Sequence, residues 1–520
     1  MSQPYTLTTA ISYPNGRPHI GHAYEVIATD AIARFHRMMG RDVFFQTGTD
    51  EHGLKMAQAA RAKGVEPQVL ADEMSSYFKE MGDRLNISYD RFIRTSEPGH
   101  HRASQALWQA MEANGDLYLG RYEGWYSVRD EAFYDDKEIT EEGGVKLSPQ
   151  GTPVEWTVEE SWFFRLSAYQ QKLLDLYAAQ PGFLRPESRR NEILRFVEGG
   201  LSDLSISRTS FDWGVKVPGA GGHVMYVWVD ALTNYLTGCG YPDDPDRMAR
   251  YWAEGGDITH IIGKDIVRFH SVYWPAFLMS AKLPLPSQIF GHGFLLNRGE
   301  KMSKSVGNVA DPMELADRFG VDQLRYFLLS EVTFGNDGSY SAEAIVQRSN
   351  SDLGNTFGNL AQRTLSFIAK NLGHLPEVHD ELPADTDLLD HVARAVCVDM
   401  PAAMADLAPS VAIEAWLRAA FACNQYIDAQ APWALRKTDP ARMETVLATL
   451  YVAIARLAVG ILPVIPDSAT ALLDHMGVAP EHRTYAAIGE EWYEALRTGG
   501  FTLAAPKPLF PRLELTETDG

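Results

Sequence analysis

Two histidines near the N-terminus, His19 and His22, flank Gly21 where a long helix is predicted to begin. Side chains three residues apart project from the same side of a first helical turn. The free N–H groups and the positive dipole end of such a turn favour a bound phosphate, and Gly21 lets a nucleobase or phosphate chain approach the backbone. On its own, the pattern is more typical of an ordinary helix start with two exposed or buried histidines.

Two lysines in a glycine-flanked loop, Lys301 and Lys304, form a second candidate site. They lie in the sequence Lys-Met-Ser-Lys-Ser between Gly299 and Gly307. Ammonium groups on flexible stems can close over a polyphosphate and stabilise the charge that develops on it. Taken alone, the segment would be interpreted as a solvated lysine loop.

The elements that must position these residues alternate between strands and helices. A helix is predicted over residues 19–39, and strands are predicted over 5–11, 42–46, 224–229, 258–262 and 288–290. Alternation of this kind indicates a parallel sheet with covered faces. Ligands of such sheets bind beyond the carboxyl ends of the strands. Segments 14–22 and 48–53 follow the first two strands, so we expect both at that edge.

The chain divides into five parts by sequence character. Residues 116–223 lose the alternation and form a predicted insertion, which splits the sheet domain into residues 1–115 and 224–296. The lysine loop and the region after it occupy residues 297–352. Residues 353–520 are predicted to be a helical bundle, because apolar residues recur there at helical spacing. One such stripe consists of Ile413, Trp416, Leu417, Ala420, Cys423 and Ile427.

Composition limits the class of protein. The net charge of −21 argues against binding of nucleic acid through a broad basic face. Three cysteines without a CxxC pair exclude a disulfide framework and a cysteine-rich zinc site. The apolar stretch 451–466 is too short to span a membrane and contains Arg456, so we expect a buried helix there. We therefore expect a soluble, cytoplasmic protein with no membrane partner.

The two candidate sites together resemble the motifs of the class I aminoacyl-tRNA synthetases, which place HIGH and KMSKS in this order around a split sheet. Further segments narrow the resemblance to the methionyl-tRNA synthetase family. They are Ala10-Ile-Ser-Tyr13-Pro-Asn15-Gly16, Thr47-Gly-Thr-Asp50-Glu-His-Gly53, Tyr226-Val-Trp228-Val-Asp230-Ala231, Ile262-Gly-Lys-Asp265-Ile-Val-Arg-Phe-His270, Gly291-His-Gly-Phe294 and Ala431-Pro-Trp433. The resemblance extends from Tyr5 to Arg512.

The resemblance implies a fold, a reaction and a set of binding residues. The fold would be α/β, with a Rossmann-like parallel sheet split by an insertion and followed by a helical anticodon-binding bundle; residues 297–352 would also contact the tRNA stem. ATP with Mg²⁺ would activate L-methionine, and the methionyl group would pass to the terminal adenosine of tRNA(Met). The implied methionine-binding residues are Ala10, Ile11, Tyr13, Asp50, Trp228, Ala231, Tyr235, Ile266 and His270. The implied ATP-binding residues are His19, Gly21, His22, Gly263, Asp265, His292, Lys301 and Lys304, of which His19, His22, Lys301 and Lys304 would be catalytic.

Physical chemistry makes these roles reasonable. A thioether is apolar and only a weak acceptor, so aromatic rings with one hydroxyl or imidazole donor suit it. Asp50 would pair with the α-ammonium group, and Asp265 would accept hydrogen bonds from ribose hydroxyls. Outside this context, Trp228, Tyr235 and His270 would be interpreted as ordinary core residues.

Because the chain is acidic, we expect it to recognise tRNA through a few residues rather than through a broad basic surface. The resemblance places the anticodon, which reads CAU in the family, against Asn359, Arg363 and Trp433. Unstacked bases are held by aromatic stacking and edge hydrogen bonds. The alternatives are a core Trp433 and a solvated Arg363. The cluster Arg185, Arg189, Arg190 and Arg195 would contact the acceptor stem or form a solvated helical face.

The chain departs from the family in the insertion, where many members carry a zinc-binding knuckle. Ser127 and Asp130 occupy the positions of the first cysteine pair, and segment 148–151 lacks Cys and His at the second. Since Ser and Gly do not replace thiolate ligands, we predict no structural zinc. We also predict a monomer.

Two other classes of protein share some of these features. A small nucleotidyltransferase would share the histidine turn but would not need the helical C-terminal third. A non-catalytic tRNA-binding protein would keep the bundle but would tolerate loss of His19, His22, Lys301 or Lys304, all of which are present.

Overall fold

The computed structural model describes residues 3–130, 132–297, 299–300, 302, 309–485 and 491–515. Its centre is a six-stranded sheet in which every neighbouring pair is parallel. The order is β3 (Arg91–Arg94), β2 (Asp42–Thr49), β1 (Pro4–Thr9), β13 (Ile258–Gly263), β14 (Gln288–His292) and β9 (Leu184–Arg185). The predicted parallel sheet is confirmed. Its last strand, β9, comes from the predicted insertion and is only two residues long.

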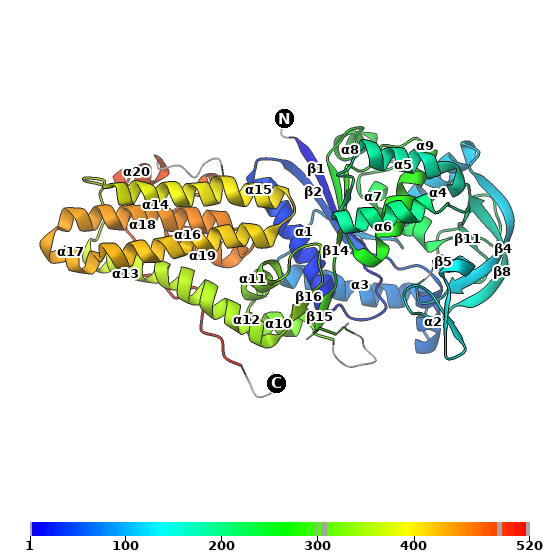
Figure 1. The fold of residues 1–520 in the computed structure, drawn as a ribbon, viewed down its shortest axis with the longest axis horizontal. Coiled ribbons are helices and arrows are strands. Elements are labelled where there is room, and N and C mark those ends of the chain that lie inside the picture. Colours follow the sequence, from blue (N-terminus) through cyan, green and yellow to red (C-terminus); the bar gives the residue numbers. More distant parts are fainter. Residues whose placement is uncertain are drawn as a thin grey trace.

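The two faces of the sheet pack into different cores, because alternate side chains of a strand point in opposite directions. Leu7 and Phe45 belong to a core with α1 (Ile20–Met38) and the C-terminal helices. Phe44 and Ile258 belong to a second core with the insertion, α7 (Val227–Gly238) and α9 (Trp274–Ala281). The sheet therefore lies between the helical domain and the insertion, as Figure 1 shows.

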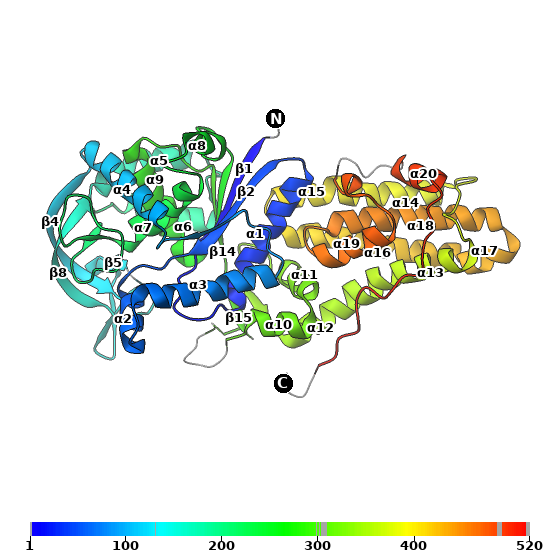
Figure 2. The ribbon, with the colours of Figure 1, turned by 180° about the vertical axis from the view of Figure 1, so that it is seen from behind.

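Four further helices complete the sheet domain. They are α2 (Leu54–Lys63), α3 (Pro67–Arg84), α4 (Pro98–Ala113) and α8 (Pro245–Tyr251). Helix α3 lies beside α1 and α10 (Pro312–Phe319), which Figure 2 shows from behind.

The insertion is built on an antiparallel sheet of order β10 (Leu204–Ser205), β8 (Glu155–Phe164), β4 (Leu117–Ser127) and β5 (Ala132–Tyr134). Two small ribbons accompany it, β6 (Thr140–Glu142) with β7 (Val145–Leu147) and β11 (Ser207–Arg208) with β12 (Val224–Met225). Its helices are α5 (Gln170–Ala179) and α6 (Glu187–Glu198).

The predicted strand over 224–229 is wrong beyond Met225, because α7 begins at Val227. Valine and aromatic residues favour a strand locally. Trp228, Ala231 and Tyr235 are nevertheless spaced by three and four residues, which is helical spacing. Packing of this face into the core decides in favour of the helix.

The C-terminal part is helical from residue 312 onward. Two short strands pair in parallel here: β15 (Leu295–Asn297) precedes the helical part, and β16 (Gly338–Tyr340) interrupts it. The helices after α10 are α11 (Val321–Glu331), α12 (Ala342–Arg348), η5 (Ser349–Gly358), α13 (Asn359–Asn371), α14 (Pro383–Arg394), η6 (Ala395–Asp399), α15 (Met400–Ala405), α16 (Pro409–Gln430), α17 (Pro432–Thr438), α18 (Pro440–Ile461), α19 (Pro466–His475), η7 (Pro480–His482) and α20 (Glu491–Thr498).

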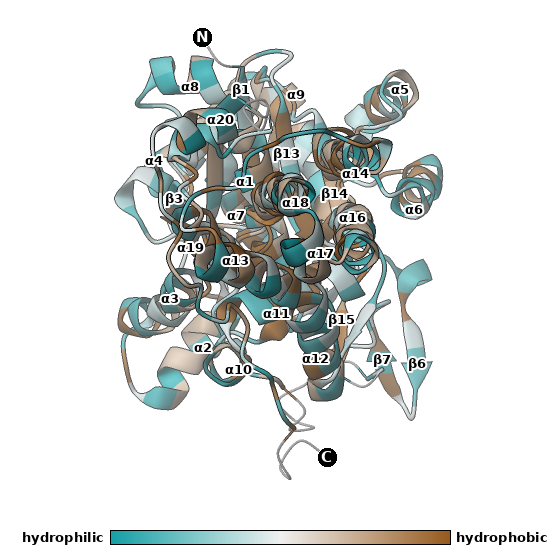
Figure 3. Cartoon of the chain, turned by 90° about the vertical axis from the view of Figure 1, so that its left-hand side faces the viewer, coloured by the Kyte–Doolittle hydropathy of each residue, from teal (hydrophilic) through white to brown (hydrophobic). Residues whose placement is uncertain are grey.

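Helix α18 is the centre of this bundle. It is long and apolar enough to cross a membrane by length and composition, yet 94% of its apolar window is buried inside the protein. Figure 3 shows it surrounded by α13, α14, α16, α17 and α19, all of which it contacts. It is therefore the core helix of the bundle, as expected for the apolar stretch there.

A buried ion pair joins the bundle to the sheet domain. Asp30 of α1 and Arg325 of α11 are 2.7 Å apart, and both side chains are fully buried. Arg325 also donates to the carbonyl oxygens of Pro463 and Val464, between α18 and α19. The middle of α1 is thus fixed directly to the bundle.

Candidate active site and anticodon surface

A cavity of about 520 Å³ lies at the carboxyl ends of β1, β2, β13 and β14. Its wall contains most of the predicted site residues: Ala10, Ile11, Tyr13, His19, Gly21, His22, Asp50, Trp228, Gly263, Asp265, Ile266 and His292. Ala231, Tyr235 and His270 are not in the wall but are buried behind it. Sequence reasoning missed other wall residues, which include Asn15, Glu25, Lys55, Arg129, Gln150 and Phe269.

The lysine segment is only partly described. Lys301 and Lys304 lie outside the described residues. Met302, between them, lines the cavity and packs against the core that contains α1.

The two histidines cap α1 with their own rings. His19 Nδ1 accepts a hydrogen bond from the Gly21 backbone at 3.1 Å, and His22 Nδ1 accepts one from the His19 backbone at 3.1 Å. The N–H groups of Ile20 and His22 donate to the carbonyl oxygens of Ala310 and His19. The expectation of free N–H groups at this turn is therefore wrong, because the backbone N–H groups of residues 19–22 are all bonded within the protein.

This capping changes what the histidines offer to a ligand. Because each Nδ1 accepts a hydrogen bond, the proton of each neutral ring is on Nε2. A Cβ at Gly21 would lie 2.8 Å from the His19 ring, so glycine leaves room for the capping imidazole. The rings of His19 and His22 lie 3.9 Å apart by their centroids. Together they can present two N–H donors at one end of the helix.

Glu25 and His292 form a hydrogen-bonded pair at the cavity wall. Their carboxylate and Nε2 atoms are 2.7 Å apart, while His292 Nδ1 lies 2.8 Å from the Gly293 carbonyl oxygen, to which it donates. Burial raises the pKa of Glu25. Burial alone would lower the pKa of His292, but the hydrogen bond that His292 donates to the Glu25 carboxylate raises it above its ordinary value. Glu25 lies three residues after His22, so helical spacing would have predicted it.

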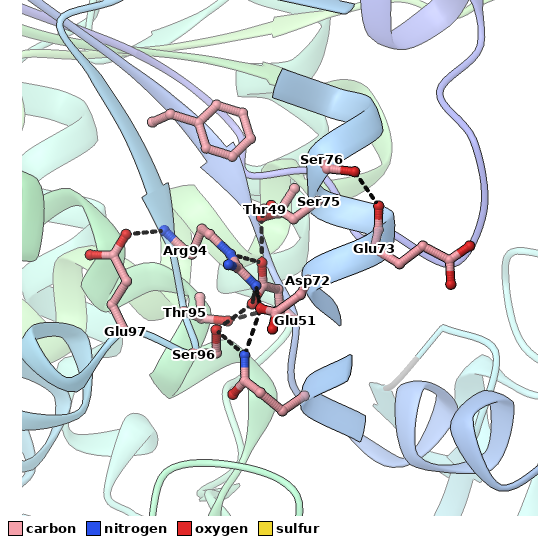
Figure 4. Close-up of polar contacts among 12 residues, drawn as sticks. Thr49, Glu51, Asp72, Glu73, Ser75, Ser76, Arg94, Thr95, Ser96 and Glu97 are labelled. Atoms are coloured by element: carbon pink, nitrogen blue, oxygen red, sulfur yellow. Dashed lines mark hydrogen bonds and ion pairs between the residues drawn. The ribbon is translucent and has the colours of Figure 1, made fainter. Parts of the chain in front are cut away.

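The loop that carries Asp50 is fixed by the two residues that follow it, Glu51 and His52. Glu51 is fully buried, and its carboxylate accepts hydrogen bonds from Arg94 Nε at 2.7 Å, from Arg94 Nη2 at 3.0 Å and from Thr49 at 2.8 Å. Ser96 also donates to it, as Figure 4 shows. The Glu51 backbone N–H donates to Thr95 Oγ1 at 2.8 Å. The loop is thereby anchored to β3.

His52 anchors the same loop to α7. Its Nδ1 lies 2.6 Å from Asp230, whose other oxygen lies 2.7 Å from His100 Nε2. Burial acts to raise the pKa of Asp230, but the two imidazoles overcome this and hold that pKa below its usual range. Asp230 is two residues from Trp228, so one network fixes both the Asp50 loop and the aromatic wall.

The aromatic part of the wall is ordered by hydrogen bonds behind it. His270 Nδ1 donates to the Ile266 carbonyl oxygen at 3.0 Å, so Nε2 accepts from the Tyr235 hydroxyl at 2.7 Å. Burial lowers the pKa of His270 to about 4, which keeps the ring neutral. In front of them, Trp228 and Phe269 stack with centroids 3.8 Å apart. The result is an apolar, rigid wall.

The predicted anticodon residues lie at the far end of the molecule from the cavity, on α13 and α17. Trp433 is 47% exposed and is not a core residue. The Arg363 guanidinium lies 5.4 Å from the Trp433 ring centroid and 2.9 Å from Asp428. Asn359 is exposed one turn before Arg363. Leu353, Phe357, Leu360 and Thr364, on η5 and α13, are buried and form the opposite, core-facing side of this segment.

The arginine cluster of the insertion is partly used inside the protein. Arg185 pairs with Asp406 of the bundle at 2.8 Å, and Arg189 pairs with Glu192 at 2.7 Å. Arg190 and Arg195 donate to the backbone carbonyls of Tyr177 and Asn191.

The positions of a zinc knuckle hold hydroxyl groups and one carboxylate instead. Ser127, Asp130, Ser148 and Thr152 are joined by hydrogen bonds to one another. Within the described ranges, no group of three or more His, Cys, Asp or Glu side chains could hold a metal ion.

Comparison with known proteins gives a consistent answer. The family model described as tRNA synthetases class I (M) matches residues 5–365, and that described as the anticodon binding domain of methionyl tRNA ligase matches residues 375–519. Methionine–tRNA ligase of Brucella suis biovar 1 is 58% identical over 512 residues, and the match covers 98% of each chain. The Mycobacterium bovis ligase is 56% identical over 520 residues, also covering 98% of each chain.

Solved structures agree with the sequence relatives. The Mycobacterium tuberculosis methionyl-tRNA synthetase in complex with methionyl-adenylate superposes with a TM-score of 0.94 at 55% identity, covering 98% of this chain and all of that one. The apo form of that synthetase has a TM-score of 0.88 at 50% identity, covering 99% of both chains.

Proposed function

The chain belongs to the methionine–tRNA ligase family of class I aminoacyl-tRNA synthetases, and on that premise we propose how its residues divide the work of the ligase reaction. The protein is a methionine–tRNA ligase, which activates methionine as an adenylate and then transfers it to tRNA. The assignment of individual residues to these steps is our proposal. It is supported chiefly by one observation: a single cavity brings the two histidines, Asp50, Asp265 and the aromatic wall together.

Methionine would lie between Asp50 and the aromatic wall. The Asp50 carboxylate would pair with the α-ammonium group, while Trp228, Tyr13, Ala10, Ile11 and Ile266 surround the side chain. Tyr235 and His270 would act from behind, with Ala231, by fixing the wall. Leucine or isoleucine would lose the sulfur contacts, and one such difference discriminates by about 1–3 kcal/mol.

ATP would lie along the other half of the cavity. Asp265 would accept hydrogen bonds from the ribose hydroxyls, while Gly263, Gly21 and His292 line the nucleotide. His19 and His22 would donate from Nε2 to phosphate oxygens, and Lys301 and Lys304 would neutralise the departing pyrophosphate. Mg²⁺ would enter with the substrate as its ATP complex, since the described residues form no metal cage of their own.

Adenylate formation would be an in-line displacement. The methionine carboxylate oxygen forms a bond to the α-phosphorus as the bond to the bridging oxygen of pyrophosphate breaks. The protein then contributes mainly orientation and stabilisation of charge. In the second step the terminal 2′-hydroxyl attacks the methionyl carbonyl and AMP leaves.

Recognition of tRNA(Met) would use the bundle. We assign residues 353–520 to anticodon binding, with Trp433 as a stacking surface and with Asn359 and Arg363 as hydrogen-bonding groups beside it. We further propose a cytoplasmic monomer. Sedimentation would show a mass near the chain mass of 57.9 kDa, and a mass of about twice that value would contradict the monomer.

Amino-acid-dependent ATP–pyrophosphate exchange, measured with all twenty amino acids, tests the proposal for the cavity. Methionine is expected to support the fastest exchange, and Asp50→Ala is expected to abolish most of it. A different preferred amino acid would overturn the assignment of the methionine pocket. Absence of exchange with every amino acid would favour a non-catalytic tRNA-binding protein.

A further inference from the structure

A turn of the insertion forms part of the cavity wall. Arg129 and Asp130, just after β4, and Gln150, in the following turn, line the cavity together with His19, Asp50 and Asp265. Apart from Met302 of the lysine segment, the rest of the wall comes from the sheet domain. The insertion therefore reaches the site where the substrates would meet, and its contribution depends on how this turn is held.

Asp130 holds the turn by collecting hydrogen bonds from separate segments. Its Oδ2 accepts from Tyr134 at 3.0 Å, from Ser148 at 2.7 Å and from Thr152. Its backbone N–H donates to Ser127 Oγ at 3.1 Å. Ser127, Ser148 and Thr152 are at most 3% exposed, so these bonds are shielded from water. One carboxylate thus joins β4, β5 and the turn before β8 where a metal would join them.

A second contact fixes the insertion to the wall of the cavity. Glu138 pairs with Arg268 at 3.0 Å, and the two side chains are 17% and 27% exposed. Arg268 also lies over the Phe196 ring at 4.1 Å. Because Arg268 is next to Phe269 in the chain, this pair connects the insertion to the segment that carries the aromatic wall.

Arg129 differs from its neighbours in having no such task. Its side chain is exposed, and it makes no hydrogen bond or ion pair with any residue in the described part of the chain. It stands at a cavity whose wall also holds Glu25, Asp50 and Asp265. A guanidinium at this position can offer two parallel N–H donors to a phosphate group.

We propose that Arg129 binds a phosphate group in this cavity, and that the Asp130 hydrogen-bond cluster takes the place of a metal in positioning it. The phosphate belongs to ATP or to the 3′ end of tRNA, two sources with the same chemistry. The inference rests on the proposed binding of ATP in the cavity. It adds an anion-binding residue from a part of the chain with no sequence motif for it.

The first test compares Arg129→Gln with Arg121→Gln, which removes the same charge from β4 of the same insertion. Loss of a charge-assisted hydrogen bond is expected to lower activity about 10- to 100-fold. If the ATP phosphates are the ligand, kcat/KM for ATP falls in pyrophosphate exchange. If the tRNA end is the ligand, exchange is unchanged and kcat/KM for tRNA falls in aminoacylation. Arg129→Lys should retain part of the activity in either case.

Two results would overturn the role of Arg129. One is a variant with unchanged kinetics in both assays, and the other is a loss no larger than that of Arg121→Gln. Failure of the wild-type protein to exchange pyrophosphate would instead count against the proposed function, so the two failures are distinguishable.

A double-mutant cycle tests the positioning by Asp130. Asp130→Ala should reproduce the kinetic defect of Arg129→Gln, and the double variant should be no worse than either one. Ser148→Ala, which removes a single donor, should give a smaller defect of the same kind and serves if Asp130→Ala fails to fold. Additive losses in the double variant, or a normal KM for both phosphate substrates in Ser148→Ala and Asp130→Ala, would show that Asp130 does not act through Arg129.

Discussion

Replacement of Arg94 by methionine is expected to release the loop that carries Asp50. Arg94 makes a bidentate contact with Glu51, whose side chain is fully buried, and a single contact with Asp72, whose side chain is 53% exposed. Methionine keeps the length of the side chain but leaves the Glu51 carboxylate with hydroxyl partners only. Removing one partner of a buried ion pair costs about 3–5 kcal/mol, because the remaining charge is uncompensated.

Hydrogen exchange followed by mass spectrometry measures this cost where it arises. An energy of about 3–5 kcal/mol corresponds to a factor of about 150 to about 4,000 in the opening equilibrium. Peptides covering residues 48–54 should lose that much protection, and the KM for methionine should rise because Asp50 precedes Glu51. Asp72→Asn is the matched control, since an exposed pair contributes about 0–1 kcal/mol.

Two outcomes would refute this reasoning. If Arg94→Met changed exchange of residues 48–54 no more than Asp72→Asn, the buried pair would not hold the loop. If adding Glu51→Gln to Arg94→Met gave no recovery of protection, the cost would not come from the stranded carboxylate, because glutamine removes that charge at nearly the same size.

Three other predictions follow from the structure. Trp433→Ala should raise the KM for tRNA about 5- to 150-fold, because stacking of one base contributes about 1–3 kcal/mol, while pyrophosphate exchange stays near normal. Trp156→Ala, which removes another exposed tryptophan, is the control. Equal loss of both activities in Trp433→Ala would contradict the anticodon assignment. His270 has a pKa of about 4 in the folded protein and is therefore neutral above that pH. Between pH 6.5 and pH 4 the unfolded chain binds a proton at this residue that the folded protein does not bind. The free energy of unfolding therefore falls as the pH falls through this range. His270→Gln should reduce this fall by about 2 kcal/mol at pH 5, as measured by equilibrium unfolding at pH 7.5 and pH 5. Identical pH profiles of stability for the variant and the wild-type protein would contradict this prediction. Protein washed with chelator should hold no zinc by elemental analysis, because the hydroxyl groups of Ser148 and Thr152 are not zinc ligands; stoichiometric zinc would contradict this.

The cavity was largely predictable because a parallel sheet collects its loops at one edge. His22, Asp50 and Asp265 are far apart in sequence, yet each follows a strand, and strands of one direction bring their ends together. The aromatic wall was harder to predict. Trp228 lies in a segment whose valines favour a strand while the spacing of Trp228, Ala231 and Tyr235 favours a helix, and packing in the core decides between the two.

The contribution of the insertion was not predictable for a different reason. Arg129 and Gln150 reach the cavity because the length and twist of the antiparallel strands before them set their position. No local sequence pattern predicts where the end of such a strand pair lies relative to the cavity. The sequence did show that cysteines were missing there. It did not show that Asp130 and three hydroxyl groups form a closed hydrogen-bond cluster, because each is a common surface residue when considered alone.

Helix α1 connects the two ends of the enzyme through a few side chains. Its first turns carry His19, His22 and Glu25 at the cavity, and Asp30, little more than a turn later, forms the fully buried pair with Arg325. Its other donors bond to the backbone carbonyls of Pro463 and Val464 in the bundle and of Leu85 and Asn86 after α3, and the arginine side chain is fully buried. A buried pair of this kind tolerates little displacement, because separating its charges in a dehydrated environment costs several kcal/mol. The histidines therefore keep a fixed position relative to the bundle, and a shift of the bundle would move α1 as a unit.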